Sequence, residues 1–563
     1  MALRLPIGVS DFRNLREDGA EYIDKSHLII EMLDRATEVL LLPRPRRFGK
    51  TVNLSMLRYF FEKRPEDLSH LFQDLAVWKA GDEYRRHFQR YPVIFLTFRD
   101  IKAQSFEQCW TELAAKIQAL YDEHRGVLDS GALSPVELRN FQAILDGTAE
   151  PVVYRRALGD LSMYLHRATG ERTVILIDEY DQPIHAGFVN GYPREALDLS
   201  RAFLTAGLKD NPHLARGVVT GILRVARESI FSGLNNLAVY TLLQKNFSTC
   251  FGFTEPEVES LLAKAGRRDA AEIVRTWYNG YDFGGTVVYN PWSLLSYLAD
   301  EEARPRPHWL NTSSNDLIKL LLQGRATTLQ QTFERLLADG SVERLLDENV
   351  VLDQLEQSDD ALWSLLVFAG YLRAERAPSG DPMLPQTHLL TIPNLEVRSL
   401  YTGTFRAWMQ TGLSAQGGNL DRLLRALLDG DAEELGHQIA AFATNILSYH
   451  DVGRLRPEDV YHSFVLGLLA SLEPGHRVRS NRESGKGRPD VLVLPTRPGA
   501  PGAVLELKVA KGGKTLDQAL DEGADQIRRK DYAAELRAAG ATPVHLFAVA
   551  FDGKDVRVRS VTP

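Results

Sequence analysis

The sequence predicts a multidomain α/β protein, and three observations support this prediction. The chain has 563 residues, more than one hydrophobic core usually supports. In its first half, short apolar runs alternate with stretches of helical periodicity, which is typical of a parallel sheet covered by helices on both faces. Near the C-terminus the expected order becomes helix, three strands, helix and two strands. We therefore expect three parts: residues 1–254, 255–440 and 441–563.

The composition is that of an ordinary soluble globular protein, with 44% hydrophobic and 25% charged residues. Two cysteines, Cys109 and Cys250, are too few for a disulfide framework or a four-thiolate zinc site, and they suit a reducing cytoplasm. The sequence shows no signal peptide and no apolar run of about 18 residues, so we expect a cytoplasmic protein without a membrane partner. The net charge of −8 is compatible with a local basic channel and decides little about nucleic-acid binding.

The first part begins with a short buried strand over Val39–Leu42. A loop follows, and Val52–Glu62 then has helical spacing with apolar residues on one side. Thr254 and Glu257 form a capping box that opens a helix, which marks the end of this part. Further buried strands are expected at residues 92–98, 173–177 and 217–220.

The middle part, residues 255–440, is mostly helical in pattern. It is interrupted at residues 277–282 and 390–394, and it contains neither an internal repeat nor a catalytic constellation. We interpret it as a helical lid or a small helical bundle.

The last part, residues 441–563, is predicted to be a restriction-endonuclease-like α/β domain. An amphipathic helix is expected at 461–472, and a second helix at 516–537. The expected strands cover residues 477–480, 490–494, 503–507, 544–550 and 556–561.

A candidate phosphate-binding loop follows the first strand. Such a loop needs backbone N–H groups around the phosphates, a lysine on the terminal phosphates and a hydroxyl on Mg²⁺. Gly49, Lys50 and Thr51 supply the end of this motif, but its usual first glycine is replaced by Arg44. Additional phosphate contacts are expected from Arg46 and Arg47, although a solvated basic loop would contain the same residues.

A second element of an ATP site, the Walker B strand, is expected at residues 174–179. The apolar strand ends in Asp178, which would hold hydrated Mg²⁺, and Glu179, which would polarise the attacking water. An apolar strand ending in Asp-Glu also arises by chance at a turn, but both motifs occur here in the right order. Thr220 and Arg224 follow the next strand and could sense the γ-phosphate, although Arg224 equally fits an ordinary surface arginine.

A candidate nuclease site lies in the last part. Residues two apart on a strand face the same side, so Glu506 and Lys508 point together while Leu507 enters the core. If the hairpin pairs in register, Asp490 approaches Glu506. Two carboxylates and a lysine fit a site that binds one or two Mg²⁺ ions, with Mn²⁺ as a substitute, and activates water. A Glu-x-Lys pattern alone is common on a solvated strand edge.

Four further residues are accessory candidates for this site. Glu458, on the upstream helix, and Glu483, just before the hairpin, could add carboxylates. Gln526 and Lys530 are four apart on the following helix, so they would share a face and contact the DNA backbone or orient the metal-bound water.

Several segments, in order along nearly the whole chain, resemble the AAA-ATPase-like proteins that carry a C-terminal PD-(D/E)XK nuclease domain. The Arg44–Thr51 string, Arg-Pro-Arg-Arg-Phe-Gly-Lys-Thr, is the most specific of them. The resemblance implies that the missing first glycine is normal for the family and that the first sheet has the ASCE-type strand order. The other segments are residues 22–26, 177–181, 220–222, 232–236, 277–282, 364–371, 487–490 and 506–508.

Within the nuclease superfamily, a relative of the RecB branch would carry Gln-x-x-x-Tyr on the second helix. Here Gln526 is followed by Lys530, and the tyrosine is Tyr532. Proteins of this architecture are also associated with mobile elements and defence against them, which is an analogy from architecture.

Three functional hypotheses follow. The leading one is an ATP- and Mg²⁺-dependent protein whose nucleotide site controls a nuclease acting on DNA, with RNA as the second choice. The alternative is an ATP-dependent switch or scaffold that binds nucleic acid or a protein without cutting. The acidic balance favours this alternative, whereas the complete Asp, Glu and Lys set opposes it. A nucleotide kinase would require a substrate pocket that the sequence does not reveal. A homo-oligomer, with an arginine from a neighbouring subunit at the ATP site, is left open.

Overall fold

The computed structural model describes residues 3–222, 235–300, 302, 304–309, 332–333, 335–337, 340–348, 358–378, 385–402, 420–446, 465, 469, 472, 475–480, 490–510, 513–530, 532–552 and 555–562. Three candidate site residues, Arg224, Glu458 and Glu483, lie outside these ranges, as does most of the expected helix at 461–472. The chain divides into two compact units: residues 1–317 with 343–394, and residues 318–342 with 395–563.

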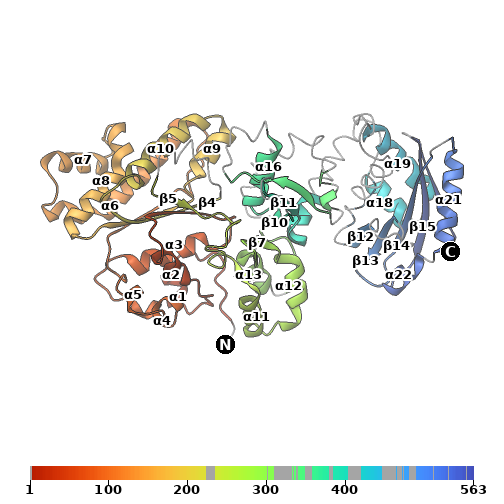
Figure 1. Ribbon diagram of the computed structural model, residues 1–563, viewed down its shortest axis with the longest axis horizontal. Coiled ribbons are helices and arrows are strands. Elements are labelled where there is room, and N and C mark those ends of the chain that lie inside the picture. The colour runs from red at the N-terminus through yellow and green to blue at the C-terminus, as the bar shows by residue number, and fades with distance from the viewer. Residues whose placement is uncertain are drawn as a thin grey trace. The chain divides into compact units, whose positions relative to one another are not determined.

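The first unit is built on a five-stranded parallel sheet (Figure 1). Its order, β2-β3-β4-β1-β5, places β4 between β1 and β3, which is the ASCE-type order. Every residue of β1 and β3 is buried, which explains why these strands read as continuous apolar runs. The strands are β1 (Val39–Pro43), β2 (Val93–Thr97), β3 (Thr173–Asp178), β4 (Leu214–Gly221) and β5 (Leu237–Val239).

Helices cover both faces of this sheet (Figure 1). One face carries α3, and the other carries α8 and α10, which also pack closely against each other. Glycines permit that close approach, because a Cβ on Gly159 would lie 2.3 Å from the carbonyl oxygen of Ala206. The helices are α1 (Phe12–Glu17), α2 (His27–Leu33), α3 (Lys50–Phe61), α4 (Ala76–Lys79), α5 (Asp82–Arg85), α6 (Phe106–Glu123), α7 (Pro135–Leu145), α8 (Pro151–Thr169), α9 (Gln182–Asn190) and α10 (Pro193–Leu208).

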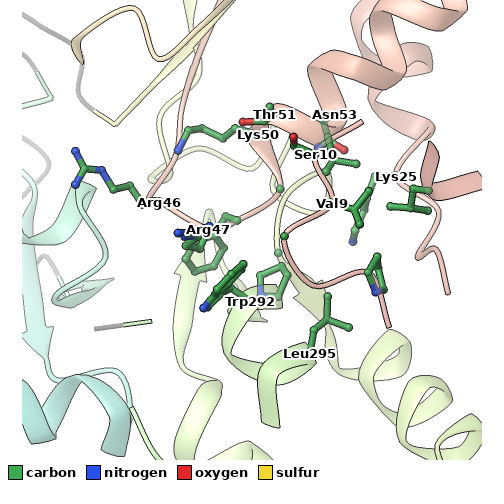
Figure 2. Close-up of a pocket in the computed structure, with 18 of the residues that line it drawn as sticks. Val9, Ser10, Lys25, Arg46, Arg47, Lys50, Thr51, Asn53, Trp292 and Leu295 are labelled. Carbon is green, nitrogen blue, oxygen red and sulfur yellow. The ribbon is translucent and has the colours of Figure 1, made fainter. Parts of the chain in front are cut away.

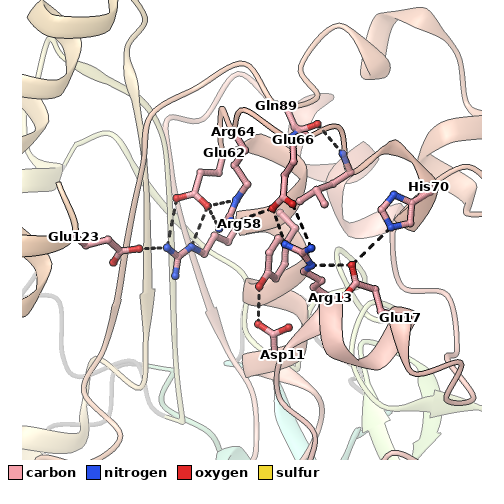
Figure 3. A network of polar contacts seen from close by, with 12 residues as sticks. Asp11, Arg13, Glu17, Arg58, Glu62, Arg64, Glu66, His70, Gln89 and Glu123 are labelled. Atoms are coloured by element: carbon pink, nitrogen blue, oxygen red, sulfur yellow. Dashed lines mark hydrogen bonds and ion pairs between the residues drawn. The ribbon is translucent and has the colours of Figure 1, made fainter. Parts of the chain in front are cut away.

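The N-terminal segment is fixed to α3 by the polar network in Figure 3. Asp11 caps α1 by accepting a hydrogen bond from the N–H of Asn14 (2.9 Å) and also accepts one from the hydroxyl of Tyr59 on α3 (2.9 Å). The N–H of the fully buried Phe12 donates to Ser55 Oγ (2.9 Å). The ion pairs of Arg13 with Glu17 and Glu66 are half-exposed and add little stability, so the buried contacts hold the segment.

The middle of the chain contains strands as well as the expected helices. Both interruptions read from the sequence lie at strands, β7 at the first and β11 at the second. One three-stranded sheet has the order β6-β8-β7, with β6 (Phe253–Thr254), β7 (Tyr281–Phe283) and β8 (Thr286–Tyr289); the other has the order β10-β11-β9, with β9 (Val342–Leu345), β10 (Arg373–Arg376) and β11 (Thr387–Thr391). The helices described there are α11 (Glu255–Lys264), α12 (Ala271–Tyr278), α13 (Pro291–Ala299), α16 (Asp359–Phe368), α18 (Leu420–Asp429) and α19 (Ala432–Ile446).

The capping box at the start of α11 is present, with Thr254 and Glu257 each bonded to the other's backbone N–H. Buried residues of α11, α12 and α13 form one core cluster. Phe48 of the phosphate loop packs against Tyr281 and Phe283 of β7, with ring centroids 4.9 and 5.2 Å apart. Residues 253–299 therefore belong to the same compact unit as the parallel sheet.

The second unit ends in a five-stranded mixed sheet, in the order β12-β13-β14-β15-β16. All neighbours are antiparallel except β14 and β15, which are parallel and joined through α21 and α22. From β12 onward the predicted order of elements is confirmed, but the helix expected at 516–537 is two helices, because the backbone leaves the helical conformation at Lys530 (φ −123°, ψ 42°). The elements are β12 (His476–Ser480), β13 (Val491–Pro495), β14 (Gly502–Val509), α21 (Leu516–Arg529), α22 (Ala533–Ala538), β15 (Val544–Asp552) and β16 (Asp555–Ser560).

Among the described residues, every helix is too short or too polar to cross a membrane.

Candidate nucleotide site and candidate metal site

The loop between β1 and α3 has the backbone of a phosphate-binding turn. Gly49, at the start of α3, has φ 85°, and Arg47 has φ 68°, so the chain makes the tight left-handed turn that such loops require. Lys50 is buried, and its Nζ donates to the carbonyl oxygens of Arg44 (3.0 Å) and Pro45 (2.9 Å). Burial lowers the pKa of Lys50, while the nearby carboxylates of Glu179 and Asp178 oppose this shift.

Arg44, at the position of the missing glycine, is a structural residue. Its side chain is fully buried, and its guanidinium donates to the carbonyl oxygens of Pro43 (2.8 Å), Tyr240 (2.7 Å) and Phe247 (3.2 Å). The guanidinium also lies over the ring of Phe251, 5.1 Å from its centroid. Burial lowers its pKa to about 10. Arg44 thus joins the loop to the chain after β5, a contact that a glycine could not make.

Substitution Arg44→Gly, which restores the usual glycine, is expected to destabilise the protein by about 3 kcal/mol, because it leaves buried carbonyl groups without donors and opens a cavity. The free energy of unfolding in urea measures this effect, with the exposed Arg139→Gly on α7 as the control for losing an arginine. An unchanged unfolding midpoint for Arg44→Gly would show that the three carbonyl contacts contribute nothing.

The carboxylate of Asp178, at the end of β3, joins three elements of the site. Its Oδ2 accepts a hydrogen bond from Thr51 Oγ1 (2.7 Å), and its Oδ1 accepts one from Thr220 Oγ1 (2.7 Å) on β4. The next residue, Glu179, has φ 52°, which is rare for a residue with a side chain and costs energy. Burial raises the pKa of Glu179, and the charge of Lys50 opposes that shift. The structure therefore brings together Lys50, Thr51, Asp178, Glu179 and Thr220.

Asp181 is a buried site residue that we did not single out from the sequence. Its Oδ2 accepts a hydrogen bond from the N–H of Ile222 (2.8 Å) and lies 3.5 Å from His185 Nε2. A Cβ on Gly221 would lie only 2.7 Å from Asp181 Oδ1, so β4 ends directly against this carboxylate. The one available indication was its place in the Ile-Asp-Glu-Tyr-Asp segment, residues 177–181.

A cavity of about 350 Å³ opens beside these residues (Figure 2). Lys50 and Arg46 lie at one end, and Val9 and Leu295 lie at the other. Arg47 lies between them, with its guanidinium 4.0 Å from the ring centroid of Trp292. The cavity therefore has a cationic end beside the phosphate loop and a mixed end, where the apolar side chains of Val9 and Leu295 lie near Lys25, which is paired with Glu257.

In the C-terminal sheet, the predicted hairpin register is present. Val491 pairs with Leu505, which places Asp490 opposite Glu506. Asp490 Oδ2 accepts a hydrogen bond from the N–H of Leu507 (2.8 Å), and Lys508 Nζ donates to Glu506 Oε1 (2.8 Å). The two carboxylates and the lysine thus share one side of the sheet.

Glu506 has the properties of a ligand for a metal ion. It is fully buried, and its Oε2 has no hydrogen-bond partner among the described residues. Burial and the charge of Asp490 raise its pKa to about 7. A buried carboxylate oxygen without a donor is costly unless a cation binds it. Asp490 and Glu506 therefore fit a divalent cation that prefers oxygen ligands.

Gln526 belongs to this cluster, although the expected Gln-x-x-x-Tyr spacing is absent. Its Oε1 accepts a hydrogen bond from Lys508 Nζ (2.9 Å), and its Nε2 donates to the hydroxyl of Tyr532 (3.1 Å). The helix break between α21 and α22 lets Tyr532 reach Gln526 from six residues away. Lys530 lies exposed at the break itself, so helical spacing does not place it beside Gln526.

The fold and these sites define an ASCE-type P-loop domain followed by a nuclease-like α/β domain. Residues 6–231 match the family described as "Predicted AAA-ATPase", and residues 456–560 match the "PD-(D/E)XK nuclease superfamily". A protein of Azotobacter chroococcum mcd 1, described as an uncharacterized protein in the vnfD 5' region, is 30% identical over 565 residues, covering 97% of this chain and 96% of that protein. The chain belongs to the AAA-ATPase-like proteins with a C-terminal PD-(D/E)XK nuclease superfamily domain.

Proposed function

We propose that this protein binds and hydrolyses ATP at the N-terminal cavity and thereby controls a metal-dependent nuclease that cleaves DNA in preference to RNA. The observation that carries the proposal is the buried, unpartnered Oε2 of Glu506 beside Asp490 and Lys508. A domain that only binds has no need of such a costly carboxylate pair. A role in defence against mobile elements, in the cytoplasm, is the cellular setting that we propose from the architecture alone.

At the N-terminal site, Lys50 would bind the terminal phosphates, and Arg46 and Arg47 would add contacts to them. Thr51 and Asp178 would hold Mg²⁺, which supplies charge neutralisation at the phosphates. Glu179 would polarise the attacking water, and Thr220, bonded to Asp178, would sense the γ-phosphate. The end of the cavity with Val9 and Leu295 would hold the base.

At the C-terminal site, Asp490 and Glu506 would hold Mg²⁺, with Mn²⁺ as a substitute; the ion supplies a water of lowered pKa and neutralises charge at the scissile phosphate. Lys508, held between Glu506 and Gln526, would orient the attacking water. Glu458 and Glu483 would add carboxylates, and Lys530 would contact the nucleic-acid backbone.

A second candidate function is an ATP-dependent switch whose nuclease-like domain binds a partner without cutting it. The exposed arginines of the C-terminal sheet favour this candidate, because acidic side chains already pair with them and leave them less available to nucleic acid. Arg557 lies 2.9 Å from Asp517, and Arg479 lies 2.8 Å from Glu535. These pairs reduce the positive surface available to a phosphate backbone.

The two candidates differ in a cleavage assay on single- and double-stranded DNA and RNA with Mg²⁺ or Mn²⁺, with and without ATP. We expect the wild type to cleave DNA and Asp490→Ala to lose cleavage. Absence of cleavage under every condition, with or without binding of nucleic acid, would favour the switch and contradict the nuclease.

Mg²⁺ binding at the C-terminal site is expected to strengthen as the pH rises through about 7. Burial raises the pKa of Glu506 from 4.5 to about 7, so the folded, metal-free protein favours the protonated carboxyl. The protonated carboxyl therefore makes its full contribution to the stability of the folded, metal-free protein below pH 4.5, and this contribution is lost as the pH rises through 7. At the higher pH a cation can take the place of the proton. The Mg²⁺-induced shift of the unfolding temperature should therefore be larger at pH 8 than at pH 6. Equal shifts at both pH values would contradict this role of Glu506.

Tyr532 is expected to position Gln526, and Tyr532→Phe should lower the cleavage rate about tenfold. The phenyl ring keeps the packing but leaves the Gln526 amide without its acceptor, so Lys508 loses a fixed partner. A cleavage-rate-against-pH profile separates this from a packing effect, because a looser contact between Lys508 and Glu506 should change the raised pKa of Glu506. An unaltered rate and profile would show that the tyrosine hydroxyl has no such role.

A further inference from the structure

Arg99 follows β2 and lines the cavity with Glu179, the residue that we propose to polarise the attacking water. The last pair of the β2–β3 ladder is Thr97 with Asp178, and the N–H of Phe98 donates to the carbonyl of Asp178 (3.0 Å). The chain after β2 therefore leaves the sheet next to Glu179. Arg99 lines the same cavity as Lys50 and Glu179.

The side chain of Arg99 is exposed and makes no hydrogen bond or ion pair within the part of the chain that the structure describes. Its positive charge nevertheless affects the pKa values of two other residues that line the cavity. Burial and then the charge of Arg99 lower the pKa of Arg47, and the charge of Arg99 also opposes the raised pKa of Glu179. Two guanidinium groups and the Lys50 ammonium thus line one space together with the carboxylate of Glu179, an arrangement that suits an anion bound beside Glu179.

We propose that Arg99 is a catalytic residue that contacts the terminal phosphate of ATP within its own chain. This inference rests on the proposed ATP hydrolysis. Water attacks the γ-phosphorus, the bond to the β-phosphate oxygen breaks, and the water proton passes to Glu179. Arg99 stabilises the negative charge that develops on the γ-phosphate oxygens, the task that a neighbouring subunit's arginine performs in many ATPases. The ATP site is then complete in one chain.

The test compares phosphate release and ATP affinity in wild type, Arg99→Ala, Arg99→Lys and Lys50→Ala, with Arg139→Ala on α7 as a matched control for an exposed arginine. Arg99→Ala should lower kcat at least about 100-fold and change the Kd for ATP less than about tenfold. Arg99→Lys should restore part of kcat, and Arg139→Ala should match the wild type. Hydrolysis by Arg99→Ala within about threefold of wild type, while Lys50→Ala is inactive, would overturn this inference and leave the proposed function standing. A wild type without ATPase activity would overturn both.

Mixing the two inactive variants tests the cis assignment. Lys50→Ala and Arg99→Ala, combined in equal amounts, should show only the sum of their separate activities, because neither chain holds a complete site. Recovery of a substantial fraction of wild-type activity would show that Arg99 acts on a neighbouring subunit and would overturn the inference.

Discussion

Glu506→Gln is expected to lower metal-dependent DNA cleavage at least about 100-fold and, at the same time, to raise the stability of the metal-free protein. The carboxylate is fully buried, with one oxygen on Lys508 and the other without a partner among the described residues. Glutamine keeps the shape and can still accept from Lys508, but it carries no charge for a cation. Removing the charge also removes a desolvation cost that grows as the pH rises through about 7.

A loss of cleavage together with a gain in stability would show that Glu506 is a metal ligand, because replacing a structural residue would lower the stability. Cleavage rate with Mg²⁺ and unfolding temperature in a chelator, both at pH 8, measure them on the same preparations. Asp521→Asn, an exposed acid on the outer side of α21, serves as the control and should leave cleavage unchanged. A Glu506→Gln protein that is less stable without metal would contradict the account of a strained carboxylate, and one that cleaves normally would contradict its role as a ligand.

Glu179→Gln is expected to lower ATP hydrolysis at least about 100-fold while ATP binding is retained. Glu179 follows Asp178, whose carboxylate is hydrogen-bonded to Thr51; it has a left-handed backbone and lines the cavity. Glutamine can occupy the same place, but it cannot accept the proton of the attacking water. Lys50→Ala should differ, because it removes a contact to the phosphates themselves and weakens binding.

Phosphate release and equilibrium binding of ATP separate these two defects. Glu195→Gln, on an exposed position of α10, is the matched control and should behave as wild type. Hydrolysis by Glu179→Gln within a few-fold of wild type would show that another residue activates the water.

Much of this architecture could be predicted from periodicity. Strands β1 and β3 are buried on both faces, so their composition alone indicates them. The period of two along β14 placed Glu506 and Lys508 on one side, and the register of a short hairpin then brought Asp490 to them. These predictions succeeded because they depend on residues close together in the chain.

Two kinds of feature escaped sequence reasoning: contacts between residues far apart in the chain, and a break within a predicted helix. Arg44 is structural only because carbonyl groups of Tyr240 and Phe247 meet its guanidinium. Tyr532 reaches Gln526 only because the predicted helix breaks, which helical periodicity could not show. The end of the cavity away from the phosphate loop likewise combines Val9 with Leu295, nearly three hundred positions apart. No local pattern contains such contacts.

Control of cleavage by ATP is the central claim, and one assay tests it most directly: the initial rate of DNA cleavage with Mg²⁺, measured with ATP, with ADP and without nucleotide. The account predicts that the wild-type rate depends on ATP and that the rate of Lys50→Ala does not. A Lys50→Ala protein that cleaves at the wild-type rate with the same dependence on ATP would contradict it.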